Sequence, residues 1–209
     1  MRGSVGILGS GTVGRTLAAG LRDLGYEVRI GSRDGHAVDG WDGGVGTFAD
    51  VAGNAEIIVL AAKGTAAEDI VSSVGTELSG KTVLDTTNPI ADAPPTDGVL
   101  HYFTSLDESL MERLQAAVPA ARFVKAFSTT GAATMVQPQY AAGRPTMFIC
   151  GNDADAKQTA TAILNELGWD ATDMGGAVAA RAVEPLCMLW CIPGLRENSW
   201  THAFKLLRP

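Results

Sequence analysis

Cysteine and histidine are scarce in this chain, and their scarcity excludes some classes of protein. The 209 residues include three cysteines, Cys150, Cys187 and Cys191. An odd number without paired spacing does not suit a disulfide-stapled fold or a zinc site. Cys187 and Cys191 share a helical face, but no histidine lies near them in the sequence. We interpret them as core residues and expect no metal site.

Long apolar runs and basic residues are also lacking. No stretch of about twenty apolar residues is present, so we expect no membrane partner. The apolar stretch near the N-terminus is short and broken by glycine, unlike a signal peptide, which favours a cytoplasmic location. Sixteen basic residues against 23 acidic ones give a net charge of −7. Because nucleic acid needs a basic surface, we expect no nucleic-acid partner.

What the chain does contain is an alternation of short apolar runs and helical patterns. Residues 5–8 form an apolar run typical of a buried strand. Apolar residues then recur at helical spacing from Thr12 onward, and Gly25 ends that pattern before an apolar strand at 27–30. Strand, turn, helix and strand make a βαβ unit with parallel strands.

The alternation continues to about residue 176. Further strands are predicted at 56–61, 81–85, 122–127, 146–151 and 169–176, and helices at 65–80, 105–118 and 153–168. In the second of these helices, Ser105 and Glu108 have capping-box spacing, and the inner face is expected to carry Leu106, Leu110 and Leu114. Residues 40–46 read as a surface loop. The pattern predicts an α/β, Rossmann-type, doubly wound and mostly parallel sheet.

The last part of the chain has a different character. From Val178 onward the pattern is helical and is interrupted by Pro193 and Gly194, which predicts two short helices. We therefore divide the chain into a main domain at residues 1–176 and a helical segment at residues 177–209. The segment is expected to line a substrate pocket, to form the contact of a homodimer, or both.

A glycine-rich turn lies where the first strand meets the first helix. It has the pattern G-x-G-x-x-G and consists of Gly9, Ser10, Gly11, Thr12, Val13 and Gly14. In this context Gly9 permits a tight turn, Gly11 lets a pyrophosphate approach the backbone, and Gly14 lets the helix pack on the sheet. The helix N-terminus adds free N–H groups and a positive dipole end. These residues predict a dinucleotide site in the 1–176 domain.

The end of the second strand indicates which dinucleotide binds. An NAD site usually places an acidic residue there, about twenty residues after the first glycine, but this chain has Ser32 and Arg33. A hydroxyl and a guanidinium both bind a 2′-phosphate, whereas a carboxylate repels it. We therefore predict NADP(H). The alternative is that Arg33 is only solvated and that Asp34 turns towards the ribose.

Other candidate residues follow the remaining strands, because ligands of open parallel sheets bind beyond the carboxyl ends of the strands. Asn88 is suited to hold the ribose or the carboxamide of the nicotinamide half. The further cofactor-binding candidates are Ala61, Ala62, Lys63, Asn88 and Pro89, and the candidate substrate-pocket residues are Lys125, Phe127, Ser128, Thr129 and Trp190.

Two of these candidates have open alternatives. Lys125 is a cation within an apolar strand, so it either reaches the strand end towards an anionic ligand or lies on an exposed edge. Trp190 and Trp200 are placed to line a pocket for a flat ring, although aromatic residues at helical spacing are more often part of a core or a dimer contact.

No acid–base machinery is visible in the sequence. His36, His101 and His202 are scattered and lack a neighbouring acidic partner, and no Ser-His-Asp order or G-x-S-x-G motif occurs. We therefore assign no catalytic residue. Hydride transfer between two redox cofactors needs no catalytic acid or base, since the main requirement is the orientation of the two rings.

Five motifs together resemble a known family. In chain order they are ILGSGTVGRTLA, VRIGSRD, IIVLAAK, LDTTNP and VKAFSTTG, within residues 4–152. They resemble the NADPH-dependent deazaflavin (factor 420) reductases, a family of dinucleotide-binding oxidoreductases. The resemblance implies that Ser32 and Arg33 contact the 2′-phosphate, that Thr12 and the glycine turn contact the pyrophosphate, and that the Asn88-Pro89 segment lies near the nicotinamide. It also implies direct hydride transfer between NADPH and a deazaflavin or flavin.

The identity of the small-molecule acceptor stays open at this point. One alternative is an NADP(H)-binding sensor or regulatory module without turnover. Another is a reductase of ferric iron or of small carbonyl or imine compounds. The motifs identify NADP(H) as the cofactor, but none of them identifies the second partner.

Overall fold

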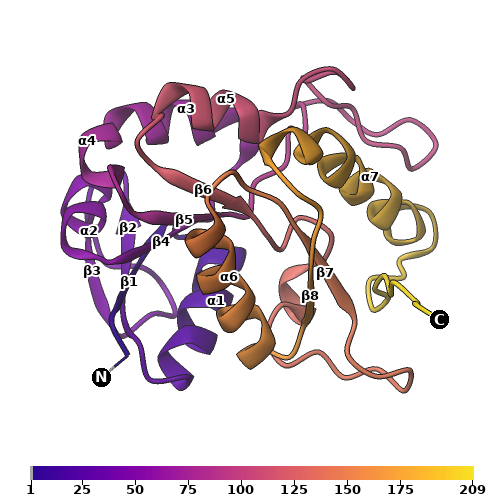
Figure 1. The fold of residues 1–209 in the computed structure, drawn as a ribbon, viewed down its shortest axis with the longest axis horizontal. Coiled ribbons are helices and arrows are strands. Elements are labelled where there is room, and N and C mark those ends of the chain that lie inside the picture. The colour runs from indigo at the N-terminus through magenta and orange to yellow at the C-terminus, as the bar shows by residue number, and fades with distance from the viewer. Residues whose placement is uncertain (1) are drawn as a thin grey trace.

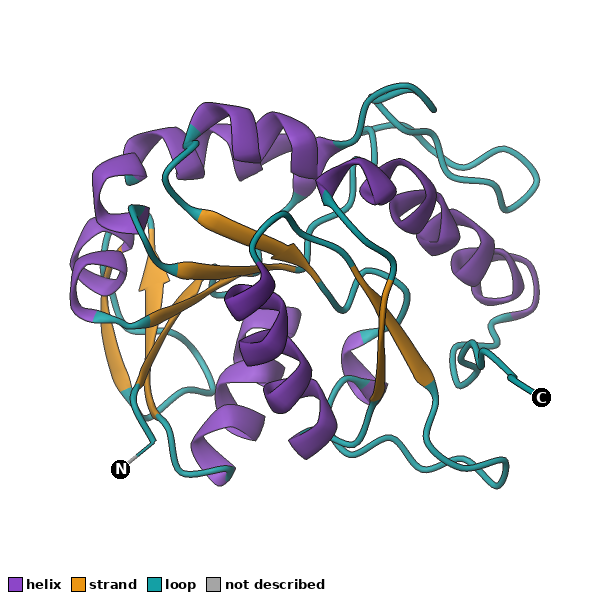
Figure 2. Ribbon diagram, viewed as in Figure 1, coloured by secondary structure: helices purple, strands orange, loops and turns teal. Residues whose placement is uncertain are grey.

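A six-stranded parallel sheet forms the centre of the computed structural model, which describes residues 2–209 (Figures 1 and 2). The strands are β1 Ser4–Leu8, β2 Glu27–Ser32, β3 Gly44–Thr47, β4 Ile57–Leu60, β5 Thr82–Asp85 and β6 Arg122–Lys125. Their order is β3-β2-β1-β4-β5-β6. This order confirms the doubly wound Rossmann fold, in which the chain moves from β1 to one edge and from β4 to the other.

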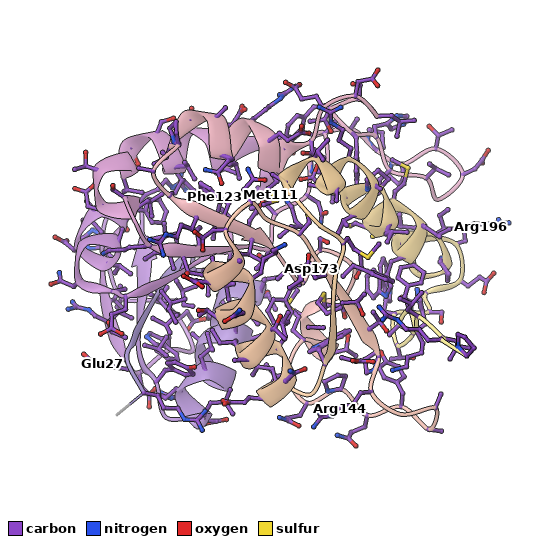
Figure 3. The ribbon with its side chains drawn as sticks, viewed as in Figure 1. Glu27, Met111, Phe123, Arg144, Asp173 and Arg196 are labelled. Atoms are coloured by element: carbon purple, nitrogen blue, oxygen red, sulfur yellow. The ribbon has the colours of Figure 1, made fainter. Side chains whose placement is uncertain are left out.

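Helices cover both faces of the sheet. They are α1 Thr12–Asp23, α2 Phe48–Asn54, α3 Gly64–Ser73, α4 Gly75–Leu78, α5 Leu110–Ala117, α6 Ala154–Glu166 and α7 Ala180–Glu197, with 3-10 turns at Ala132–Thr134 and Ala177–Ala179. Helices α1 and α6 cover one face, and α2 to α5 cover the other (Figure 1). Met111 of α5 and Phe123 of β6, labelled in Figure 3, belong to the second of these two cores. Because both faces are covered, the strands are apolar on both sides.

The last two predicted strands form a small sheet of their own. Strands β7 Thr146–Ile149 and β8 Asp170–Asp173 pair in parallel, apart from the main sheet. The two sheets meet where the backbone N–H of Lys125 donates to the carbonyl of Cys150 at 2.9 Å. Strand β6 ends at Lys125, earlier than predicted, and two residues later the backbone of Phe127 is left-handed, with φ of 57°. That turn directs the chain away from the sheet.

Helix α5 begins later than the sequence predicts. The capping box is formed by Ser109 and Glu112 rather than by Ser105 and Glu108. Leu106, predicted on the inner face, is 76% exposed. The capping box at Ser109 and Glu112 lies four residues after the predicted one at Ser105 and Glu108. The helix begins at the later box because the first N–H groups of the helix bond to Glu184.

The loop predicted at residues 40–46 is partly a strand. Strand β3 begins at Gly44 and pairs with β2, and α2 follows with a capping box between Thr47 and Asp50. Glycine has a low strand propensity, so the sequence read as a loop. Pairing with the exposed edge of β2 overrides that propensity.

The C-terminal segment contains one helix where two were predicted. Helix α7 runs through Pro185 and Pro193, each of which removes one backbone hydrogen bond. Packing compensates for the loss, since Trp190 is buried and Trp200 lies directly against Gly194. After α7 the chain runs beside β7, where the N–H of Thr146 donates to the carbonyl of Phe204 at 2.9 Å.

The stretch Ala177–Glu197 meets the length and composition of a membrane-spanning helix, with a mean hydropathy of 1.3. A helix that packs on a protein core meets the same two criteria. Glu184, in the middle of this stretch, is 1% exposed and pairs with a buried lysine of the main domain. The apolar character of α7 is thus accounted for in part by its packing on the domain.

A buried cluster of three charges joins α7 to the sheet. The ammonium of Lys125 lies 2.6 Å from a carboxylate oxygen of Asp85 and 2.8 Å from one of Glu184. The lysine side chain is 0% exposed. Burial alone would lower the pKa of Lys125, but the two carboxylates more than offset this and raise it. Lys125 therefore lies neither on an exposed edge nor free to reach a ligand, which corrects both alternatives for it.

Replacing the lysine of this cluster should destabilise the protein. Lys125→Met leaves Asp85 and Glu184 as two buried carboxylates without their cation, and we expect the free energy of unfolding to fall by about 3 to 5 kcal/mol. Urea denaturation followed by circular dichroism measures this change. The matched control is Arg122→Met on the same strand, an exposed position where we expect a change below about 1 kcal/mol. Equal losses in both variants would show that the cluster contributes no more than a surface ion pair.

Candidate functional site

The candidate site is the crevice where the order of the strands reverses. Strands β1 and β4 are neighbours, and the chain leaves their carboxyl ends in opposite directions. A cavity of about 760 Å³ opens there. Its lining residues are Gly9, Ser10, Gly11, Arg33, Phe48, Ala61, Ala62, Lys63, Ala66, Asp69, Ile70 and Ser73. The cavity thus brings together predicted residues from three separate strand ends.

The glycine turn forms the base of this cavity. Gly9 has a φ of 136°, which side chains rarely allow, and a Cβ there would collide with the carbonyl of Ala61. A Cβ at Gly14 would collide in turn with the carbonyl of Gly9. At Gly11, by contrast, a Cβ would meet nothing within 4 Å. Gly11 therefore leaves open space that a ligand can enter, as the sequence predicted.

The N-terminus of α1 faces this space without a side-chain cap. Gly11 is its N-cap residue, and no acidic residue lies in the first turn. The Arg15 side chain donates to the carbonyl of Ser10 at 2.7 Å and braces the turn. Thr12 is exposed, whereas Val13 is half-buried against the core, so only its backbone is left for a phosphate. Free N–H groups at a helix start suit a pyrophosphate.

The end of β2 carries a hydroxyl, a guanidinium and a carboxylate side by side. Arg33 is exposed and lines the cavity. The Ser32 hydroxyl donates to the Asp34 carboxylate at 3.2 Å, and so does the backbone N–H of His36 at 3.3 Å. These two bonds, the one from His36 first, hold the pKa of Asp34 below its usual value. Asp34 is thus an anion in contact with Ser32 and is 64% exposed.

Five residues that line this cavity were not predicted from the sequence, namely Phe48, Ala66, Asp69, Ile70 and Ser73. Phe48, at the start of α2, and Ile70, on α3, contribute apolar surface to the cavity, and Asp69 contributes a carboxylate. Phe48 has room because residue 31 is glycine, where a Cβ would lie 3.1 Å from the phenyl ring. Phe48 reaches the site because β3, which precedes it, pairs with β2, and no sequence pattern indicated that pairing.

A second cavity of about 320 Å³ continues from the first and shares Ala62 and Lys63 with it. Its lining residues are Ala62, Lys63, Gly64, Thr65, Thr86, Thr87, Asn88, Ile90 and Asp92. Asn88 was predicted here, and its amide donates to the carbonyl of Ser128 at 3.0 Å. Pro89 is buried and does not line the cavity.

In the loops that follow β5 and β6, three buried side-chain polar atoms have no hydrogen-bond partner within the described residues. They are the side-chain oxygens of Asn88, Ser128 and Thr129. A buried polar atom without a partner costs free energy, and in native sites a ligand or water commonly supplies the partner. Ser128 and Thr129 are 1% and 2% exposed, so they contribute polar groups without lining the cavity walls.

Two other substrate-pocket candidates belong to the core. Phe127 is 2% exposed and meets Trp169 edge to face, with ring centroids 6.5 Å apart. Trp190 stacks on His202 at 5.1 Å and donates from its ring N–H to the carbonyl of that residue at 2.9 Å. Neither residue lines the two cavities. For Trp190 the packing alternative describes the structure better.

A larger cavity of about 830 Å³ lies elsewhere, between the end of α5 and the start of α6. Gln115, Arg122 and Asp153 are among its lining residues. It opens beside Arg122, at the amino end of β6. Ligands of open parallel sheets bind at the opposite, carboxyl ends, so the smaller pair of cavities is the better candidate.

Comparison with known proteins identifies the family of the chain. The sequence model of the family "NADP oxidoreductase coenzyme F420-dependent" matches residues 4–89. A solved chain from Arthrobacter sp. FB24, assigned as an F420-dependent NADP reductase, is 32% identical with a TM-score of 0.90, over 99% of this chain and 100% of that one. A hypothetical protein from Sinorhizobium meliloti is 25% identical with a TM-score of 0.72, over 85% of this chain and 87% of that one.

One relative is a larger protein. The metalloreductase STEAP3 of Rattus norvegicus is 31% identical over 198 residues, which make up 91% of this chain and 38% of the metalloreductase. The chain therefore spans well under half of that relative. Taken with the full-length similarity to the Arthrobacter chain, these comparisons show that the chain belongs to the family of F420-dependent NADP oxidoreductases, enzymes with a dinucleotide-binding Rossmann domain.

Proposed function

We propose that this chain transfers hydride between NADPH and a deazaflavin or flavin-type acceptor. The observation that carries the proposal is the position of Arg33, which lines the same cavity as Gly9 and Gly11. One cavity thus offers a phosphate-binding turn and, at the end of β2, a cation for the 2′-phosphate. Membership of the family supports the same cofactor.

The two cavities suit the two halves of the cofactor. The larger one has the turn for the pyrophosphate and the apolar side chains of Phe48 and Ile70 for the adenine. The smaller one has the Asn88 amide, whose oxygen is without a partner, for the nicotinamide carboxamide. A cavity with a few polar groups among apolar ones is the usual form of a cofactor site.

The chemistry needs orientation more than proton transfer. When bound, NADPH supplies the hydride, and the acceptor ring must lie against the nicotinamide face. Lys63 and Asn88 line the inner cavity, where they fix the position of the nicotinamide half. Because hydride passes directly between rings, no side chain has to give or take a proton for the transfer itself.

A metal ion complex is the second candidate acceptor. The similarity to a protein named as a metalloreductase favours it, although this chain spans only 38% of that protein. Ferric chelates would accept electrons through a flavin more readily than hydride directly, so this candidate also predicts flavin binding. The flavin-type acceptor therefore remains the first proposal.

The proposed role of Arg33 predicts a change in cofactor preference. Arg33→Ala removes a charged hydrogen bond to the 2′-phosphate, so NADPH binding should weaken by about 1.5 to 3 kcal/mol. NADH lacks that phosphate, and its affinity should barely change. Titration of intrinsic tryptophan fluorescence with each cofactor measures both constants. The control is Arg144→Ala, an exposed arginine on a distant loop (Figure 3). Equal losses for NADPH and NADH in the Arg33 variant would contradict the proposal.

Asp34 allows a test with the opposite sign. Its carboxylate is ionised at neutral pH, as an ordinary aspartate is, and its hydrogen bonds lower its pKa further, so it repels a 2′-phosphate bound at Ser32. Asp34→Asn should therefore tighten NADPH binding by about two- to fivefold, and high salt should reduce the gain. If Asp34 instead bonds the ribose of NADH, the same variant would weaken NADH and leave NADPH unimproved. Calorimetric titration at low and high salt separates these outcomes.

Turnover distinguishes an enzyme from a sensor. We expect the purified protein to oxidise NADPH, followed at its nicotinamide absorbance, when factor 420 or a flavin is added. The panel is factor 420, FMN, FAD, and ferric chelates with and without flavin. If ferric chelates are reduced only when flavin is added, the result would support the flavin as the direct acceptor of hydride and iron as the second acceptor. Tight NADPH binding without oxidation by any acceptor would favour the regulatory module instead.

A further inference from the structure

The loop that carries Asn88 is held by the buried charge cluster. Asp85 accepts from the backbone N–H of Thr87 at 2.9 Å and from its hydroxyl at 2.6 Å. The Lys125 ammonium donates to the carbonyl of the same threonine at 2.9 Å. All three polar groups of Thr87 are thus fixed by two charged side chains. Because Asn88 follows directly in the chain, its backbone is held in place by the same bonds.

The third member of the cluster comes from the C-terminal helix. A carboxylate oxygen of Glu184 forms an ion pair with the Lys125 ammonium at 2.8 Å, and its two oxygens accept from the N–H groups of Leu110 and Met111 at 2.9 and 3.0 Å. Its carboxylate therefore also caps α5 and explains why that helix begins at Leu110. The ammonium thus has three oxygen neighbours, from Asp85, Thr87 and Glu184, at 2.6, 2.9 and 2.8 Å.

The amide of Asn88 is the end point of this chain of bonds. Its NH₂ group donates to Ser128, and its backbone carbonyl packs so closely on Gly64 that a Cβ there would collide. The Asn88 side chain lines the inner cavity, and its amide oxygen is buried without a partner in the described part of the chain. An acceptor held this rigidly is suited to the N–H of a primary carboxamide.

We propose that Glu184 is a positioning residue for the nicotinamide half of the cofactor. It acts through Lys125 and Thr87 on the orientation of the Asn88 amide, and it does not touch the cofactor. This inference rests on the proposed binding of NADPH. It makes the C-terminal helix a structural part of the redox site, although its aromatic side chains do not line the cavity.

A second link between α5 and α7 provides a matched control. Arg181 forms a two-pronged bond to Glu112, at distances of 2.7 to 3.1 Å, and holds the same two helices together. That pair is partly exposed and has no bond to Thr87. Arg181→Gln therefore loosens the same helix contact without changing the cluster.

The test compares two ligands in the variant Glu184→Gln. NADPH contains the nicotinamide, whereas adenosine 2′,5′-bisphosphate has the adenosine and the 2′-phosphate alone. We expect the dissociation constant of NADPH to rise about tenfold in Glu184→Gln and that of the bisphosphate to stay unchanged. In Arg181→Gln both constants should stay at their wild-type values. Isothermal titration calorimetry on the full chain measures all of them.

The outcomes separate this inference from the proposed function. Equal weakening of both ligands, or no weakening of either, would overturn the positioning role of Glu184. Failure of the wild-type protein to bind NADPH would overturn the proposed function instead. If Glu184→Gln does not fold, Thr87→Val tests a second bond by which the same cluster holds the loop, because it removes the hydroxyl bond from Thr87 to Asp85. Thr87→Val should also weaken the binding of NADPH without weakening that of the bisphosphate. If it does not, the inference is overturned.

Discussion

The reversal of winding between β1 and β4 is the constraint on which the site depends. These strands are hydrogen-bonded neighbours, but the chain leaves them towards opposite edges of the sheet. The loops that follow must therefore separate, and the crevice opens between Gly9 and Ala61, whose backbones touch at its base. Only glycine tolerates that contact, with its φ of 136°. Strand order thus determines where the cofactor can lie before any side chain contributes.

Local electrostatics offset the overall charge of the protein. The chain has a net charge of −7, Asp69 lines the cavity, and Asp34 follows the lining residue Arg33 in the sequence. An anionic cofactor is therefore attracted only over short distances, by Arg33, Lys63 and the uncapped start of α1. The bond between Ser32 and Asp34 places a carboxylate beside Arg33, so the proposed 2′-phosphate region has charges of both signs. Such a mixture of charges gives selectivity more than affinity.

The part of the site formed by adjacent segments was predictable from the sequence, whereas the part formed by distant segments was not. The glycine turn, Ser32 and Arg33 belong to one βαβ unit, so their spacing alone placed them together. Phe48 was missed because its position depends on a glycine-rich edge strand. Lys125 was misplaced because its partner Glu184 lies 59 residues further along the chain. The start of α5 was wrong for the same reason, since Glu184 provides its cap.

The cluster of Asp85, Lys125 and Glu184 also constrains how this chain can diverge from its relatives. The three residues come from β5, β6 and α7. Replacing Lys125 alone leaves two carboxylates in the interior without their cation, while replacing all three residues by apolar ones can be neutral. The three positions are therefore expected to be inherited or lost as a set. As related proteins change the C-terminal helix, position 184 is then restricted by the cluster, while the outer face of the helix is free to vary.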